Sequence, residues 1–198
     1  TEEAAAADPE AEQNEAVKEK EKEKEETTSA AEEEEEEEEK QQAEADEFDV
    51  GSDAPDFKDV LNEKGEKVSL GDFKGQYLVI YFYPKDNTPG CTNEGKRFRD
   101  LNKEFKERNC AILGVSADKV EAHKKFVEKN EFNFSLLADT SRELINAYKA
   151  AKPGNKIQRS TVLIDPEGKI AKIWNPVRGA AKHPDQVLKE LTALQEEK

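Results

Sequence analysis

An unbroken apolar run at residues 77–83 constrains the fold of this chain more than any other segment. The run is rich in aromatic and β-branched residues, and Pro84 ends it. A strand that is apolar at every position is buried on both faces, which is typical of a central strand in an α/β sheet. The chain is therefore expected to build such a sheet and to cover both of its faces with helices.

Hydrophobic spacing and turn residues predict the elements around this strand. In chain order they are a hairpin at 56–70 turning at 62–65, the strand 77–83, a helix at 92–108, a strand at 110–116, a helix at 120–130, a strand at 134–137, a helix at 141–149 capped by Ser141, a hairpin of 160–164 with 169–174, and a helix at 184–195. Strands and helices alternate first, and an antiparallel hairpin and a helix follow. That order predicts an α/β fold with a mixed sheet, which a thioredoxin-like core would satisfy.

The chain divides by composition into two parts, 1–47 and 48–198. The first part has no aromatic residue, and Val17 is its one aliphatic side chain larger than Ala. It carries 22 acidic residues against five lysines, so its net charge is −17, whereas residues 48–198 have a net charge of +2. The formal charge of −15 therefore belongs to the first part. The second part is long enough for one domain.

Residues 1–47 are predicted to form a disordered acidic tail. Without large apolar side chains the segment cannot offset its ordering entropy by burial, and the run 32–39 consists of glutamates that repel one another. One interpretation is a solvating or spacing tail, and the other is a docking segment for a basic protein.

Several classes of protein are not indicated. No apolar run approaches the ~20 residues that a membrane-spanning helix needs. The N-terminus has no apolar signal core, and two cysteines make no disulfide framework, so an intracellular, reducing compartment is expected. The cytoplasm is the first expectation, and the nucleus is the alternative. Because the second part is nearly neutral and the tail is acidic, direct nucleic-acid binding is not expected.

Cys91 lies between the buried strand and the helix that follows it. A helix start offers unpaired N–H groups and the positive end of the helix dipole, which favour a thiolate, the nucleophilic form of cysteine. Thr88, three residues earlier, could hydrogen-bond the sulfur or a peroxide oxygen, and Pro84 could shield the site from water. The alternative is a small buried cysteine with no chemical role, and the spacing alone does not decide between them.

The segment 81–92, YFYPKDNTPGCT, resembles the active-site segment of the peroxiredoxins, and most closely that of the bacterioferritin-comigratory or PrxQ branch, which includes a fungal nuclear thiol peroxidase. Pro84, Thr88 and Cys91 match the branch's Pro-x₃-Thr-x₂-Cys pattern. Further similar segments extend the resemblance over nearly all of 50–195, and the acidic tail has no counterpart in it. The resemblance implies a thioredoxin-like fold and a thiol peroxidase without a cofactor.

The resemblance also places the family's active-site arginine at Arg159, at the start of a strand. A guanidinium there would hold the thiolate and orient the peroxide. Many members of the branch have a second cysteine five residues after the first, but Lys96 stands at that position here. Cys110 follows the far end of the predicted helix, roughly 25 Å from Cys91 at ~1.5 Å rise per residue. A disulfide needs Cα atoms within about 7 Å, so we expect a one-cysteine cycle.

The expected partners are a peroxide substrate and an external thiol donor such as thioredoxin or glutathione. A monomer is expected, with a dimer as the alternative. A chaperone-like or chromatin-associated module on a peroxiredoxin scaffold is the rival function. A disulfide oxidoreductase would need Cys-x-x-Cys, which is missing, and zinc binding would need Cys91 and Cys110 to converge with two histidines, His123 and His183, that are read as solvated.

Overall fold

The computed structural model describes residues 48–198, which form one unit of the chain. The predicted acidic tail, 1–47, lies outside the described residues. Among the residues described, no helix is both long and apolar enough to cross a membrane.

A five-stranded sheet forms the centre of this unit, in the order β5-β4-β3-β8-β9. Its strands are β3 (Tyr77–Phe82), β4 (Cys110–Ser116), β5 (Ser135–Ala138), β8 (Ser160–Ile164) and β9 (Ile170–Trp174). Strands β3, β4 and β5 run parallel, whereas β8 is antiparallel to β3 and β9 is antiparallel to β8. All six side chains of β3 are buried, as its uninterrupted apolar sequence predicted. The mixed sheet and the thioredoxin-like fold are confirmed.

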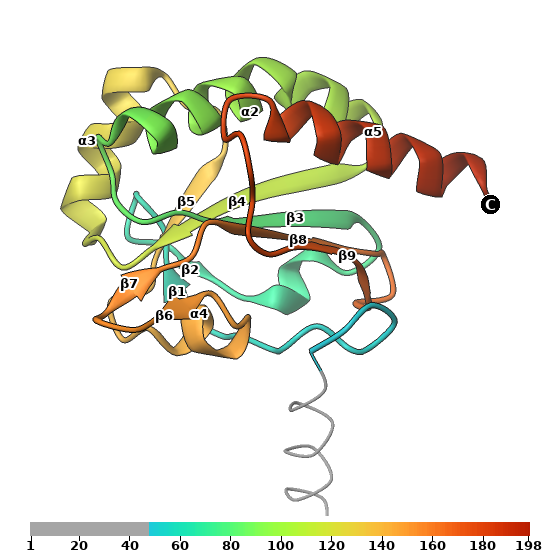
Figure 1. Cartoon of the computed structure of the whole chain (residues 1–198), viewed down its shortest axis with the longest axis horizontal. Helices are drawn as coiled ribbons and strands as arrows, with labels where there is room; N and C mark the ends of the chain where they lie inside the picture. The colour runs from blue at the N-terminus through green and yellow to red at the C-terminus, as the bar shows by residue number, and fades with distance from the viewer. Residues whose placement is uncertain (1–47) are drawn as a thin grey trace, which may run out of the picture. The chain divides into compact units, whose positions relative to one another are not determined.

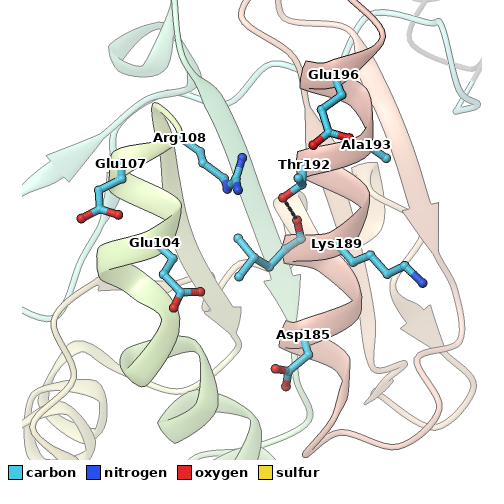
Figure 2. A pocket seen from close by; sticks show the side chains of 9 residues that line it. Glu104, Glu107, Arg108, Asp185, Lys189, Thr192, Ala193 and Glu196 are labelled. Carbon is cyan, nitrogen blue, oxygen red and sulfur yellow. Dashed lines mark hydrogen bonds between the residues drawn. The ribbon is translucent and has the colours of Figure 1, made fainter.

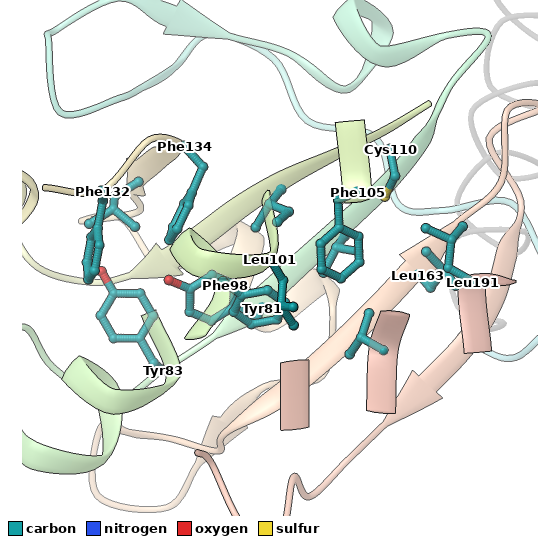
Figure 3. Close-up of a cluster of buried hydrophobic side chains, with 14 of the residues drawn as sticks. Tyr81, Tyr83, Phe98, Leu101, Phe105, Cys110, Phe132, Phe134, Leu163 and Leu191 are labelled. Carbon is teal, nitrogen blue, oxygen red and sulfur yellow. The ribbon is translucent and has the colours of Figure 1, made fainter. Parts of the chain in front are cut away.

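Helices cover the sheet unequally (Figure 1). The helices are α2 (Pro89–Glu107), α3 (Val120–Asn130), α4 (Glu143–Ala147) and α5 (His183–Glu196). Alternate residues of β3 belong to different apolar clusters, because successive side chains of a strand point to opposite faces. Val79 and Tyr81 pack with α2, α3 and α5, and Leu78 and Ile80 pack with α4. Figure 3 shows the first cluster, in which the Tyr81 ring stacks on Phe98 at a centroid distance of 4.6 Å.

Short elements complete the fold. They are β1 (Val60–Leu61), β2 (Lys67–Val68), the 3₁₀ helix η1 (Leu70–Phe73), β6 (Ala151–Lys152) and β7 (Lys156–Ile157). The first hairpin turns where it was predicted, with the Gly65 N–H donating to the Asn62 carbonyl. The β6-β7 hairpin was not predicted, because its two-residue strands lack a periodic apolar signal.

Two helix starts differ from the prediction. Helix α2 begins at Pro89 rather than at 92, since proline is well suited to the first position of a helix. Helix α4 begins after Arg142, whose φ of 64° lies in the left-handed region, and Ser141 does not cap it. The Asp139 carboxylate instead accepts the Ile145 N–H at 2.7 Å, which satisfies a donor in the first turn.

Candidate active site

Cys91 occupies the third position of α2, after Thr88 at the N-cap and Pro89 at the first position. Its side chain is buried, with 2% of the residue exposed. The earlier start of α2 places the sulfur within the first helical turn rather than before it. In that turn the backbone N–H groups have no partner inside the helix, so the helix presents positive charge beside the sulfur.

Arg159 reaches this sulfur from another part of the sheet. Strands β3 and β8 are paired so that Phe82 faces Ser160, which brings Arg159 to the end of β3 where the loop to α2 begins. The Arg159 Nη2 lies 3.2 Å from the Cys91 Sγ. A Cβ at Gly90 would lie 3.1 Å from the same Nη2, so glycine leaves room for the guanidinium. The structure thus joins two of the residues singled out in the sequence, 68 positions apart.

Glu94 was not singled out in the sequence, yet it belongs to the same cluster. It lies one helical turn after Cys91 with no exposed surface, and its Oε2 pairs with the Arg159 Nη1. The other oxygen, Oε1, has no hydrogen-bond partner among residues 48–198. Burial raises the pKa of Glu94 to about 7, although the Arg159 charge acts in the opposite direction. A carboxylate three positions from a helix-start cysteine is the signal that could have identified it.

Thr88 and Pro84 are placed differently from Arg159. The Thr88 hydroxyl donates to the Lys85 carbonyl oxygen at 2.8 Å, so its proton is not directed at the sulfur. Its lone pairs remain available to accept a hydrogen bond from a peroxide O–H. Pro84 is exposed at the end of β3, and shielding of the site by its ring stays a prediction.

Cys110 starts β4 at the far end of α2 from Cys91 and is likewise a free, buried cysteine. It lies in the apolar cluster of Figure 3, next to Phe105. Burial raises its pKa to about 12, which keeps it a neutral thiol.

The prediction that both histidines are solvated is wrong. His123 lies on the inward face of α3 together with Phe126 and Asn130, a helical spacing that could have indicated its burial. His183, at the start of α5, contacts the Thr161 hydroxyl through its Nε2 at 2.7 Å. Burial lowers the pKa of His183 to about 4, so this histidine is neutral near pH 7. The two histidines have different hydrogen-bond partners, Asp86 for His123 and Thr161 for His183.

A groove between α2 and α5 lies apart from these residues (Figure 2). Charged side chains of both helices line it, among them Glu104 and Glu107 from α2 and Lys189 from α5. Neither Cys91 nor Arg159 is among its lining residues.

Known proteins resemble the chain in sequence and in structure. A model of the AhpC/TSA family matches residues 50–173. Peroxiredoxin Bcp of Bacillus subtilis is 43% identical over 155 residues, which is 75% of this chain and 98% of the relative.

Two solved structures extend this comparison. The bacterioferritin comigratory protein of Xanthomonas campestris, in a structure whose subject is its alkyl peroxide reduction activity, has a TM-score of 0.65 and 40% identity, covering 69% of this chain and 90% of that one. A yeast mitochondrial 1-Cys peroxiredoxin, studied for thiol resolution through the glutathione and thioredoxin systems, has a TM-score of 0.66 and 28% identity, covering 74% and 76%. The chain therefore belongs to the AhpC/TSA family and, within it, is a peroxiredoxin of the Bcp/PrxQ type, a thiol-dependent peroxidase.

Proposed function

We propose that Cys91 is the thiol that reacts with peroxide and that Arg159 and Thr88 assist it. The observation that carries the proposal is the 3.2 Å contact between the Arg159 guanidinium and the Cys91 sulfur at a helix start. A guanidinium keeps its charge at any physiological pH, so it stabilises the thiolate and the oxygen that becomes negative during the reaction. Glu94 holds the other side of the guanidinium and so fixes its orientation.

The reaction is a displacement at oxygen. The Cys91 thiolate attacks one peroxide oxygen, an S–O bond forms, and the O–O bond breaks. The leaving oxygen takes a proton and departs as water or an alcohol, and the cysteine is left as a sulfenic acid. Hydrogen peroxide and organic hydroperoxides are the proposed substrates, and the alkyl peroxide activity of the Xanthomonas relative supports the second class.

An external thiol is proposed to return Cys91 to its reduced form. Its sulfur displaces the sulfenic oxygen as water and forms a mixed disulfide, which a second thiol then reduces. Lys96 is exposed on α2, so the helix has no cysteine five residues after Cys91, where many members of the resembled branch carry one. Cys110 is buried with a raised pKa, so little of it is in the reactive thiolate form. Thioredoxin and glutathione are the proposed donors, as for the yeast 1-Cys relative.

The remaining proposals concern the setting of the enzyme. The net charge of −17 in residues 1–47 supports a basic protein as partner of the tail. We further propose a monomer that acts in the cytoplasm, with the nucleus as the alternative compartment.

Peroxide consumption by the full-length protein tests the proposed chemistry. With thioredoxin and its reductase, or with glutathione, as donor, Cys91→Ser should abolish turnover. Mass spectrometry after one equivalent of peroxide should find one added oxygen at Cys91. Equal rates for wild type and Cys91→Ser would contradict the role of Cys91, and an intramolecular Cys91–Cys110 disulfide would contradict the one-cysteine cycle.

A further inference from the structure

The loop between β3 and α2, residues 83–88, carries Thr88 and leads into Cys91; Tyr83 at its start is buried, yet little of residues 84–87 is packed against the protein. Pro84, Lys85 and Asn87 are exposed, and only Asp86 among residues 84–87 is buried. An exposed loop of this kind gains little stability from apolar burial. Its position next to the sulfur therefore depends on the contacts of Asp86.

Asp86 makes three hydrogen bonds that tie the loop to the body of the protein. One carboxylate oxygen accepts the Tyr83 hydroxyl at 2.7 Å, and the other lies 2.7 Å from the His123 Nδ1. The Asp86 backbone N–H donates to the Asp118 carboxylate at 3.0 Å. Asp118 is itself held by the Ser116 hydroxyl at 2.7 Å. Tyr83 anchors the start of the loop, since its N–H donates to the Val115 carbonyl oxygen of β4, and Asp86 anchors residues 84–87 to helix α3 and to Asp118, which follows β4.

The contacts of His123 define how many protons His123 and Asp86 hold between them. Its Nε2 lies 3.0 Å from the Leu137 carbonyl oxygen, which can only accept, so Nε2 must carry a hydrogen. Its Nδ1 faces a carboxylate oxygen at 2.7 Å, and such a contact requires a proton between the two atoms. His123 and Asp86 therefore share one proton, and the pair is neutral overall whichever partner holds it.

The same geometry argues against a metal ion. Asp86, Asp118 and His123 bring ligand-type atoms within 4.8 Å of one another. The Asp118 oxygen that faces Asp86 already accepts from the Asp86 N–H and the Ser116 hydroxyl, and the His123 Nδ1 shares the proton described above. A metal ligand needs a free lone pair. Because these atoms already take part in hydrogen bonds, the three groups are described as a hydrogen-bonded cluster and not as a metal site.

We infer that His123 is a positioning residue of the peroxidase site: through its proton-bearing contact with Asp86 it fixes the 83–88 loop, and hence Thr88, relative to the Cys91 sulfur. Thr88 is linked to this anchor by its hydrogen bond to Lys85, the neighbour of Asp86. The inference rests on the proposed function of Cys91. A loop displaced by about 1 Å would place the peroxide poorly, which can cost on the order of 10²-fold in rate.

Two substitutions at His123 separate the anchor from simple filling of the core. In His123→Asn the amide nitrogen is bonded to Cγ, as Nδ1 is, so it can still donate to Asp86. In His123→Gln the nitrogen is one bond further out, as Nε2 is, so it reaches the Leu137 carbonyl and leaves Asp86 without its donor. We expect His123→Gln to lose about 10²-fold in kcat/KM for hydrogen peroxide, and His123→Asn to lose much less.

Alkylation of Cys91 by iodoacetamide provides the second measurement, because it needs the thiolate but no positioned peroxide. The inference requires His123→Gln to slow the peroxide reaction far more than alkylation. Tyr83→Phe removes one hydrogen bond to Asp86 while it preserves the ring, and it should give a smaller loss of the same kind. This milder variant serves if His123→Gln does not fold.

The outcomes distinguish this inference from the proposed function. Two results would overturn the positioning role and leave Cys91 as the reactive thiol. One is a wild-type peroxide rate in His123→Gln. The other is an equal loss of peroxide rate in the Asn and Gln variants that parallels their loss of thermal stability. A divalent metal bound at this cluster in the purified full-length protein would overturn it as well. Loss of the Cys91 assignment would instead be seen as unchanged peroxide consumption by Cys91→Ser.

Discussion

Cys91 lies at the start of α2 and Cys110 lies just after its end, and the two cysteines differ in the charged groups beside their sulfur atoms. Both are buried, with 2% of each residue exposed. Cys91 lies in the first turn of the helix with a guanidinium 3.2 Å from its sulfur. Cys110 follows the helix, and its sulfur donates to the Ala111 carbonyl oxygen at 3.5 Å. Burial alone therefore does not make a cysteine inert or reactive: the charges that accompany burial decide.

Replacement of Arg159 by glutamine should have the largest effect on the reactivity of Cys91. Cys91 would then be a buried cysteine without a cation, as Cys110 is. We expect kcat/KM for hydrogen peroxide to fall by about 10²–10³-fold. Removal of one hydrogen-bond donor that stabilises the transition state typically has an effect of this size. Stopped-flow measurement of the reduced protein with peroxide gives this value.

A double variant controls for the buried carboxyl group that Arg159→Gln leaves without its partner. Glu94 would lose its partner, which destabilises the fold independently of catalysis. In Arg159→Gln/Glu94→Gln the two buried side chains are amides that can hydrogen-bond to each other, so thermal stability should recover while the peroxide rate stays low. Recovery of the peroxide rate together with the thermal stability would mean that Arg159 acts only by stabilising the fold.

Glu94→Gln should change how the stability of the protein depends on pH. Native Glu94 keeps its proton up to about pH 7, whereas an ordinary glutamate releases it near 4.5. The native state therefore binds more protons in this window, and the free energy of unfolding falls as the pH rises from about 4.5 to 7, by up to about 3 kcal/mol. Glu94→Gln should remove this decline.

The change must be measured against wild type, because His183 acts in the opposite direction. Its native pKa of about 4 lies below its ordinary 6.5, so the unfolded state binds more protons between these values. His183 thus adds stability as the pH rises from about 4 to 6.5, and partly cancels the effect of Glu94. Urea unfolding of both proteins across this range should show a more positive slope in Glu94→Gln. Identical slopes would mean that Glu94 is not protonated in the native state.

Cys110→Ala should have the smallest effect. Cys110 lies beyond the far end of α2 from Cys91. The peroxide turnover of Cys110→Ala, and its dependence on the thiol donor, should therefore equal those of wild type. The lost packing should cost about 1 kcal/mol of stability. In wild type, iodoacetamide should modify Cys91 and spare Cys110 until the protein unfolds. Slower recycling in Cys110→Ala would give this thiol a role in the cycle after all.

Local sequence determined the sheet strands and the longer helices. The run that became β3 is buried at every position, and the boundaries of β4 and α3 agree with their apolar spacing. The sequence predicted the ends of helices and strands less well than their centres, because a few residues at an end can adopt several backbone conformations. The start of α4 shows this, since Asp139 rather than Ser141 satisfies its first turn.

From the sequence came the peroxiredoxin resemblance around Cys91 and the presence of Lys96 where many members of the branch have a second cysteine. Only the tertiary structure decided which distant residues meet this thiol. The strand order places β8 beside β3, so Arg159 reaches Cys91 and pairs with Glu94, and the packing of α3 brings His123 to Asp86. Such contacts cannot be derived from spacing along the chain, because they depend on which strands become neighbours and which face of each helix turns inward.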